Sequence, residues 1–316
     1  MTHQPDVLVV GAGVSGLTTA VCLAEAGLKV KIQTQGTGES TTSFAAGATW
    51  SLHLIESSER ARTWSFETLG VLRELAGRPA TGILLRPGVE AGSEQPAWHD
   101  RLDGFRRLDH DQVPGGLAAG WHLVAPVVEM PVYLGYLRGR AEASGVQIEI
   151  RRLASLDEAA APVVVNCTGI GARSLVGDSG LIPVRGQIVV VQNPGITEFL
   201  VVHADPLTYI FPHQDTVVLG GTVQPGNDDT APDPDTARAI VERCAHFEPR
   251  LADARVIAHR VGLRPTRSTV RLEQEGRVIH NYGHGGAGIT LSWGCARQVT
   301  SMVRAALPTA GRGSPS

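Results

Sequence analysis

The first 35 residues contain the feature that most constrains the fold. Residues 6–10 are rich in β-branched side chains and predict a short strand, a glycine-rich turn follows at residues 11–16, and the apolar pattern up to Gly27 predicts a helix. Residues 29–33 predict a second strand. A strand, glycine turn, helix and strand within about 30 residues are typical of a dinucleotide-binding βαβ unit.

Each glycine of the pattern Gly11-x-Gly13-x-x-Gly16 has a separate physical task. Gly11 would form the tight turn, Gly13 would let a pyrophosphate approach the backbone, and Gly16 would let helix and strand pack closely. Val14 and Ser15 begin the predicted helix, where free backbone N–H groups face an anion. We therefore expect all five residues at a dinucleotide site.

A second glycine-rich segment lies near the other end of the chain, in residues 280–294. It precedes an apolar, helix-like stretch and would present another helix N-terminus to an anion. The residues that we expect at this cofactor contact are Gly285, Gly286, Gly288, Ile289 and Thr290. Two such helix starts suit a ligand with two anionic regions, and FAD fits, because it carries a pyrophosphate and a flavin ring that is negatively charged when reduced.

Three further segments carry polar or small residues suited to a nucleotide. The second strand ends at Thr34 without the usual ribose-binding acid, so Thr34 or Gln35 would supply a neutral hydrogen bond. Thr168 ends another β-branched strand, with a simple strand-ending turn as the alternative. Residues 40–48 combine hydroxyls with small side chains that would admit a flat ring, namely Thr41, Thr42, Ser43, Ala46, Gly47 and Ala48. A flexible polar loop is the alternative for this last segment.

The remaining pattern predicts an α/β fold with interleaved domains. Helices are predicted at residues 56–75, 132–144 and 235–247, and strands at 82–86, 104–108, 120–126, 147–152, 162–168, 188–191, 209–212, 216–220, 255–261 and 278–281. Because nucleotide-binding signals occur at the start, middle and end, we predict a Rossmann-type FAD-binding domain built from residues 1–50, 140–185 and 260–316. A sheet-rich α+β substrate domain would be inserted, comprising residues 51–139 and 186–259.

The composition of the chain limits the kinds of binding partner that we expect. The net charge is −3, and Lys29 and Lys31 are the two lysines, so nothing favours nucleic acid or an acidic membrane as a partner. No apolar run approaches the roughly 20 residues of a membrane-spanning helix, and the N-terminus has no signal-peptide pattern. Four widely spaced cysteines lack metal-ligand spacing. We therefore expect a cytoplasmic protein without a metal site or a membrane partner.

The motifs together resemble the D-amino-acid oxidase family of FAD enzymes along essentially the whole chain. They are the N-terminal glycine pattern and the segments at residues 41–47, 165–169, 183–187, 262–265 and 280–286. The resemblance implies FAD in an elongated pose, with its ring near residues 46–48 and 285–290, and a backbone contact from Leu153 on the adenine side. It also implies hydride transfer from the substrate Cα to flavin N5. The products would be a 2-oxo acid, ammonia and hydrogen peroxide formed from molecular oxygen.

The resemblance implies roles for three residues at the substrate. Arg264 would clamp the carboxylate of a D-amino acid, the hydroxyl of Tyr209 would help to hold it, and the carbonyl of Gly286 would accept a hydrogen bond from the amine. We expect His284 to organise its loop and Arg267 to be structural.

Two departures from the family affect the side-chain pocket. The segment at residues 203–208 is too short for the lid tyrosine of animal members, and Ala287 replaces an aromatic residue found in many members. Members are often dimeric, so a homodimer is an option, although no motif marks an interface. The alternatives are an oxidase of glycine, sarcosine, D-aspartate or a secondary amine, and, in another class, a non-catalytic flavin-binding protein.

Overall fold

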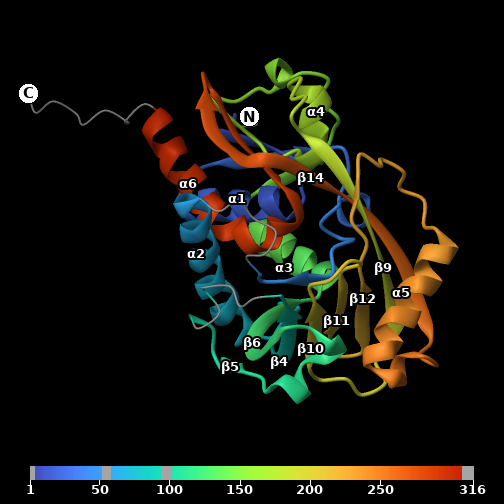
Figure 1. Ribbon diagram of the computed structural model, residues 1–316. Helices are drawn as coiled ribbons and strands as arrows, with labels where there is room; N and C mark the ends of the chain where they lie inside the picture. The colour runs from blue at the N-terminus through green and yellow to red at the C-terminus, as the bar shows by residue number, and fades with distance from the viewer. Residues whose placement is uncertain (1–3, 52–57, 94–97, 99–100, 308–316) are drawn as a thin grey trace, which may run out of the picture.

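The computed structural model describes residues 4–51, 58–93, 98 and 101–307. In these residues one connected sheet of 15 strands runs through the molecule, with helices on its faces (Figure 1). The helices are α1 (Val14–Glu25), α2 (Glu59–Ala76), α3 (Met130–Ala143), α4 (Ala172–Leu175), α5 (Pro234–Phe247) and α6 (Gly288–Ala306). The strands are β1 (Val7–Val10), β2 (Val30–Thr34), β3 (Ala48–Thr49), β4 (Ile83–Gly92), β5 (Arg106–Arg107), β6 (Ala119–Val128), β7 (Gln147–Ile150), β8 (Val163–Asn166), β9 (Ile182–Gln192), β10 (Phe199–Val202), β11 (Thr208–Pro212), β12 (Thr216–Gly220), β13 (Gln224–Pro225), β14 (Val256–Glu275) and β15 (Val278–His284).

One end of the sheet is the parallel unit predicted from the N-terminus. The order β15-β8-β1-β2-β7 is parallel throughout, with Val7 opposite Val30 on one side and Val163 on the other. Both β1 and β8 are buried along their whole length, as expected for strands covered on two faces. The predicted βαβ unit and the α/β fold class are therefore confirmed.

Helix α6 packs against both α1 and α2 beside this parallel unit (Figure 1). The approach of α2 and α6 depends on Gly294, where a Cβ atom would lie 2.3 Å from Cα of Trp64. The predicted apolar face of α2 is buried: Trp64, Leu69, Leu72 and Leu75 all belong to the core. Residues 56 and 57, where the helix was expected to start, lie outside the described residues.

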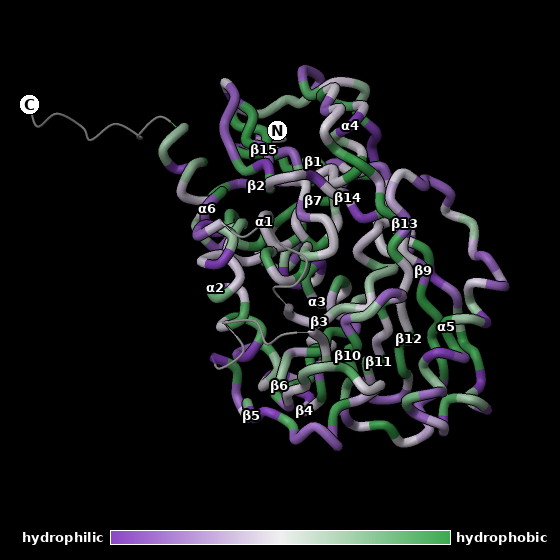
Figure 2. Tube along the Cα trace, in the orientation of Figure 1, coloured by the Kyte–Doolittle hydropathy of each residue, from purple (hydrophilic) through white to green (hydrophobic). Residues whose placement is uncertain are grey.

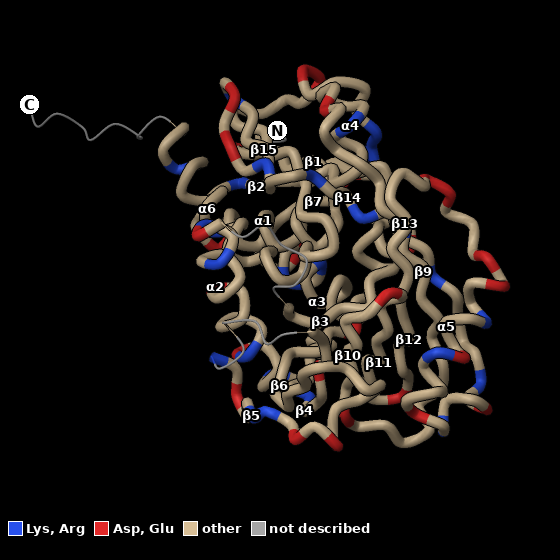
Figure 3. The backbone as a smooth tube through the Cα atoms, viewed as in Figure 1, with Lys and Arg blue, Asp and Glu red and all other residues tan. Residues whose placement is uncertain are grey.

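The other end of the sheet is mainly antiparallel, in the order β3-β6-β4-β10-β11-β12-β9. Side chains alternate between its two faces. Ile210 and Leu219 pack with Ile240 and Cys244 of α5, which covers one face (Figure 1). Tyr209, Phe211 and Val218 face the main core on the other side. Figure 2 shows hydrophilic residues mostly along the peripheral loops, and Figure 3 shows charges of both signs interspersed there.

Strands β9 and β14 join the two ends of the sheet and are longer than predicted. β14 has 20 residues, pairing first with β9 and then with β15. The sequence pattern predicted only residues 188–191 and 255–261, because Gly262 and two prolines read as breaks. In the structure Pro183 and Pro265 lie opposite each other in the antiparallel pair. The strands therefore continue through residues that normally end them.

Two other strands are longer than predicted, and one strand was not predicted at all. β4 extends the expected strand at residues 82–86 as far as Gly92, and β6 spans 119–128. β10 was not predicted, although it lies between β4 and β11 and pairs with both.

In the described part of the chain, none of the helices is both long and apolar enough to span a membrane. Nor do the described His, Cys, Asp and Glu side chains form a group of three or more suited to a metal ion.

Candidate active site

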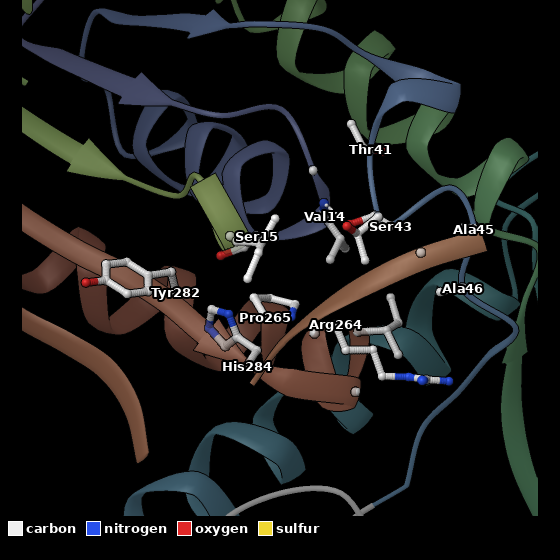
Figure 4. Close-up of a pocket in the computed structure, with 18 of the residues that line it drawn as sticks. Val14, Ser15, Thr41, Ser43, Ala45, Ala46, Arg264, Pro265, Tyr282 and His284 are labelled. Carbon is white, nitrogen blue, oxygen red and sulfur yellow. Dashed lines mark hydrogen bonds between the residues drawn. The ribbon is translucent and has the colours of Figure 1, made fainter. Parts of the chain in front are cut away.

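A cavity of about 780 Å³ lies at the carboxyl ends of the parallel strands and continues along the antiparallel sheet. Gly11 follows β1, Thr34 ends β2, Thr168 lies just after β8 and Gly285 follows β15, and all four line it. Ligands of open α/β sheets bind at this edge. Segments that are distant in the sequence therefore meet in one site (Figure 4).

Two helix N-termini meet at this cavity. α1 begins after Gly13 and α6 after Ala287, and among the described residues neither of these two cap residues makes a side-chain capping bond and neither first turn has an acidic residue. A Cβ atom on Gly288 would lie 3.6 Å from Cγ1 of Val14, so the two helix starts are neighbours. Their backbone N–H groups and helix dipoles favour negative charge.

The first glycine turn is packed too closely against neighbouring backbone to admit side chains at Gly11 and Gly16. Gly11 has a φ of +107°, and a Cβ atom there would lie 2.5 Å from the carbonyl oxygen of Cys167. A Cβ atom on Gly16 would lie 2.0 Å from the carbonyl oxygen of Gly11. Gly16 thus lets the helix pack on the turn and is not among the described residues that line the cavity.

The predicted hydroxyl groups differ in their remaining hydrogen-bonding capacity. Ser43 accepts a hydrogen bond from the backbone N–H of Val14 at 3.0 Å, which leaves its own hydrogen for a ligand (Figure 4). Thr34 and Thr168 donate at 2.7 Å to the carbonyl of Gly36 and the side chain of Asn166. Ser43 is accordingly the better donor to a phosphate, whereas Thr34 and Thr168 have lone pairs to accept a ribose hydroxyl.

Arg264 lies on β14 and reaches the cavity next to the antiparallel sheet (Figure 4). Its Nη1 donates to the carbonyl oxygen of Thr222 at 2.9 Å, and a weaker bond reaches the carbonyl of Arg185 at 3.4 Å. The guanidinium crosses directly over Gly186, where a Cβ atom would lie 2.4 Å from Nη1. These contacts fix one edge of the guanidinium and leave other N–H groups for a carboxylate.

Tyr209 stands beside Arg264 in the same wall. Burial raises the pKa of the Tyr209 hydroxyl, while the charge of nearby Arg264 partly opposes this rise, so the hydroxyl keeps its proton at neutral pH. The ring stacks on Phe211 with centroids 4.7 Å apart. A cation and a neutral hydroxyl therefore face the cavity together, an arrangement that suits a carboxylate.

His284 and Arg267 have structural partners. Nε2 of His284 lies 3.1 Å from Oδ1 of Asn281, and burial lowers the pKa of His284 to about 4, so the imidazole is neutral at pH 7. Arg267 forms an ion pair with Asp178, with Nε 3.0 Å from Oδ2. These contacts agree with a loop-organising histidine and a structural arginine.

All the sequence-predicted site residues except Gly16 line this one cavity. The cofactor set at its wall is Gly11, Gly13, Val14, Ser15, Thr34, Thr41, Thr42, Ser43, Ala46, Gly47, Ala48, Leu153, Thr168, Gly285, Gly286, Gly288, Ile289 and Thr290, and Arg264 and Tyr209 join it. Leu153 is near Thr34 because the N–H of Arg151 bonds to the Thr34 carbonyl at 2.8 Å.

Sequence reasoning missed several lining residues. Arg151 and Arg152 lie near the end of β2, Glu90 lies on β4, Val201 on β10, and His203 directly after β10. The two arginines directly precede Leu153, which was a usable signal. Glu90 had none, because an isolated acid in a strand pattern reads as a solvent-facing residue.

The residues fit FAD: the two helix starts without acidic residues suit its anionic groups, and the small residues 46–48 leave room for its flat ring. The fold and cavity define a flavin-dependent oxidoreductase class. The sequence model of the FAD dependent oxidoreductase family (DAO) matches residues 6–302, and the chain belongs to this family.

Individual relatives match over nearly their whole length. The chain is 45% identical over 313 residues to a D-amino-acid oxidase of Rubrobacter xylanophilus, covering 95% of this chain and 96% of the relative. It is 46% identical over 310 residues to a D-amino-acid oxidase of Streptomyces coelicolor, covering 94% and 96%. Among solved structures, glycine oxidase from Geobacillus kaustophilus has a TM-score of 0.83 at 22% identity, covering 98% of this chain and 96% of that one, which shows a shared fold.

Proposed function

We propose that this FAD-dependent oxidoreductase is a D-amino-acid oxidase, which converts D-amino acids, molecular oxygen and water to 2-oxo acids, ammonia and hydrogen peroxide. The observation that carries the proposal is the placement of Arg264 and Tyr209 together at the wall of the cavity that holds both helix N-termini. A protein that only binds flavin needs no such carboxylate clamp. The two bacterial relatives named D-amino-acid oxidase support the same reaction.

In this proposal the glycine turns and helix starts hold FAD. The N-terminus of α1 and the Ser43 hydroxyl would bind the pyrophosphate, and residues 46–48 and 285–290 would border the ring. The N-terminus of α6 would favour negative charge on a ring bound there, as an oxyanion hole would. When bound, FAD supplies the hydride acceptor for the substrate Cα–H bond.

The protein's own groups orient the substrate. Arg264 pairs with the α-carboxylate through N–H groups not used by the Thr222 carbonyl, and the Tyr209 hydroxyl donates a further hydrogen bond. The carbonyl of Gly286 accepts a hydrogen bond from the neutral amine. Fixing carboxylate and amine leaves one Cα–H direction toward the ring, which sets the D stereochemistry. No protein base is required at Cα, in agreement with a neutral, hydrogen-bonded His284.

Three predictions from the sequence accompany this function as proposals. The FAD-binding domain comprises residues 1–50, 140–185 and 260–316, and the substrate-binding domain residues 51–139 and 186–259. The protein works in the cytoplasm. A homodimer remains the predicted assembly option, and analytical ultracentrifugation would test it directly.

An anaerobic titration of the yellow protein tests the reaction. D-amino acids, their L enantiomers, glycine and sarcosine are added in turn while the flavin absorbance is followed. Bleaching by D-amino acids, with reoxidation and peroxide release on admission of oxygen, is the expected result. Bleaching only by glycine or sarcosine would replace the proposal with another amine oxidase of this fold, and bleaching by none would favour the flavin-binding alternative.

A further inference from the structure

A buried acid occupies the cavity wall near the proposed substrate clamp. Glu90 lies on β4, is 2% exposed and lines the same cavity as Tyr209 and Arg264. A carboxylate so deeply buried needs neighbouring polar groups, and Glu90 pairs with His203, whose Nε2 lies 3.3 Å from Oε2. Neither the FAD fit nor the carboxylate clamp uses this group.

Strand register places Glu90 in line with Tyr209. Glu90 is opposite Val201 in the pairing of β4 with β10, and Val201 is opposite Tyr209 in the pairing of β10 with β11. Residues opposite each other share a face of the sheet, and strands are about 4.8 Å apart, so Glu90 stands roughly 10 Å along this row from Tyr209. Val201 also lines the cavity between them. The row therefore runs from Tyr209, where the α-carboxylate of a substrate would bind, to the side-chain carboxylate of Glu90.

His203 helps to hold Glu90 in this position. Its Nε2 lies 3.3 Å from Oε2 of Glu90, and its backbone N–H donates to the carbonyl of Ala91 at 2.8 Å. His203 also lines the cavity, from the loop that follows β10. The acid is therefore held by its neighbours before a ligand arrives, which lowers the entropy cost of binding.

His203 lies beside Glu90, and the arginines that line the cavity lie elsewhere. Among the described lining residues, Arg151 and Arg152 adjoin the end of β2, and Arg264 is assigned to the α-carboxylate. A substrate held by Arg264 and Tyr209 that extends its side chain along the row meets Val201 and then Glu90. In its ionised form Glu90 would repel an acidic side chain there, whereas it would form a charge-assisted hydrogen bond with a guanidinium or ammonium group.

We propose that Glu90 is a specificity-determining residue that selects D-amino acids with a cationic side chain, such as a guanidinium or ammonium group on an extended stem. This inference rests on the proposed oxidase function and adds the substrate class. Glu90 acts on the side chain alone, so its removal should leave the oxidation of neutral D-amino acids intact.

The wild-type enzyme gives the first test, with substrates matched in shape. D-Arginine and D-citrulline have the same length and differ in charge, as do D-glutamate and D-glutamine. We expect kcat/KM for D-arginine to exceed that for D-citrulline by about 10- to 100-fold, the range of one charge-assisted hydrogen bond, and D-glutamate to be poorer than D-glutamine. Equal values for D-arginine and D-citrulline would overturn the proposal.

The variant Glu90→Gln gives the second test, because Gln keeps the shape and a hydrogen bond to His203 while removing the charge. It should abolish the preference for D-arginine and leave kcat/KM for D-methionine within about threefold. Glu142→Gln, which removes a surface acid paired with Arg138, is the matched control and should change neither value. An equal loss for all substrates in Glu90→Gln would assign Glu90 to the general machinery and refute a specificity role.

A binding measurement keeps the proposal testable if Glu90→Gln does not fold. Competitive inhibition of the wild-type enzyme by 5-guanidinopentanoate is compared with inhibition by neutral 5-ureidopentanoate, both of which lack the reacting amine. The charged inhibitor should bind about tenfold more tightly. Oxidation of neutral D-amino acids without any charge preference would refute this inference alone, whereas oxidation of no D-amino acid would refute the proposed function as well.

Discussion

The ring of Tyr209 lies directly against the backbone of Gly220, its partner across the β11–β12 pair: a Cβ atom on Gly220 would lie 2.0 Å from Cζ of the ring. A Cβ atom on Gly221 would lie 2.5 Å from Cε1, and one on Gly47 would lie 3.0 Å from Cε2. Three glycines from two parts of the chain therefore make the space for this ring. The Tyr209 hydroxyl can lie beside Arg264 only because these three positions carry no side chain.

Replacing Gly220 with Ala should displace Tyr209. Because the added methyl group cannot share space with the ring, the hydroxyl would leave the carboxylate site, and KM for D-amino acids should rise about tenfold, the value of one hydrogen bond to a charged group. Bound FAD should be retained. Gly139→Ala in α3, where the space is open, is the control. The measurement is KM for D-amino acids in the two variants. An unchanged KM in Gly220→Ala would contradict the assignment of Tyr209 to the carboxylate site.

Replacing Arg264 tests the carboxylate clamp itself. Arg264→Ala should lower kcat/KM by 100-fold or more, on the order of 3 kcal/mol, and Arg264→Lys should recover only part, because an ammonium cannot bind a carboxylate in the same bidentate way. The flavin spectrum should persist in both variants.

Arg267→Ala provides the control for the loss of an arginine on the same strand. It removes the ion pair with Asp178 and should lower the melting temperature by a few degrees while leaving KM nearly unchanged. A larger kinetic defect in Arg267→Ala than in Arg264→Ala would reverse the two roles.

Ser43 should contribute to FAD affinity. Ser43→Ala leaves the N–H of Val14 without this acceptor and removes a hydroxyl donor at the helix start, so the Kd for FAD should rise about tenfold. Titration of apoprotein with FAD, followed by quenching of flavin fluorescence, measures it. Thr63→Ala removes an exposed hydroxyl that bonds to the carbonyl of Glu59 within α2 and should leave the Kd unaltered. Equal Kd values for the two variants would place the pyrophosphate elsewhere.

The cofactor side of the site was largely predictable because its signals are local. A glycine turn followed by an apolar helix specifies a free helix N-terminus within a few residues, as at Gly13 and Gly288. Arg264 was predicted from its short motif, although the surrounding strand was not. The continuous strand β14 depends on Pro265 facing Pro183, a pairing between distant segments.

The substrate side was less predictable because it depends on strand register. Glu90 reaches the cavity only because β4 pairs with β10 in one register, and a shift by one residue would turn it to the other face. β10 itself is a four-residue strand that local patterning missed. Side chains such as Glu90 and Val201 therefore had no local signal, whatever their importance for substrate selection.

Buried His213 should make the protein less stable in mild acid. Its Nε2 has no hydrogen-bond partner among the described residues, and burial, with the charges of Arg260 and Arg86, lowers the pKa of His213 to about 4. Between about pH 6.5 and pH 4 the unfolded chain binds a proton that the folded chain does not, so stability falls as the pH falls. Above about pH 6.5 both states are neutral and the effect vanishes.

The variant His213→Gln removes this titration. Melting temperatures measured from pH 8 to pH 4 should therefore decline less steeply than in the wild type, by the equivalent of up to about 3 kcal/mol at the acid end. His284, whose pKa is also about 4, keeps its own share of the decline in this variant. His246→Gln, at an exposed site of α5, should follow the wild-type curve. If the melting temperatures of His213→Gln and the wild type declined in parallel with falling pH, His213 would be protonated in the folded protein. The hairpin between β11 and β12 would then accommodate a charged imidazole.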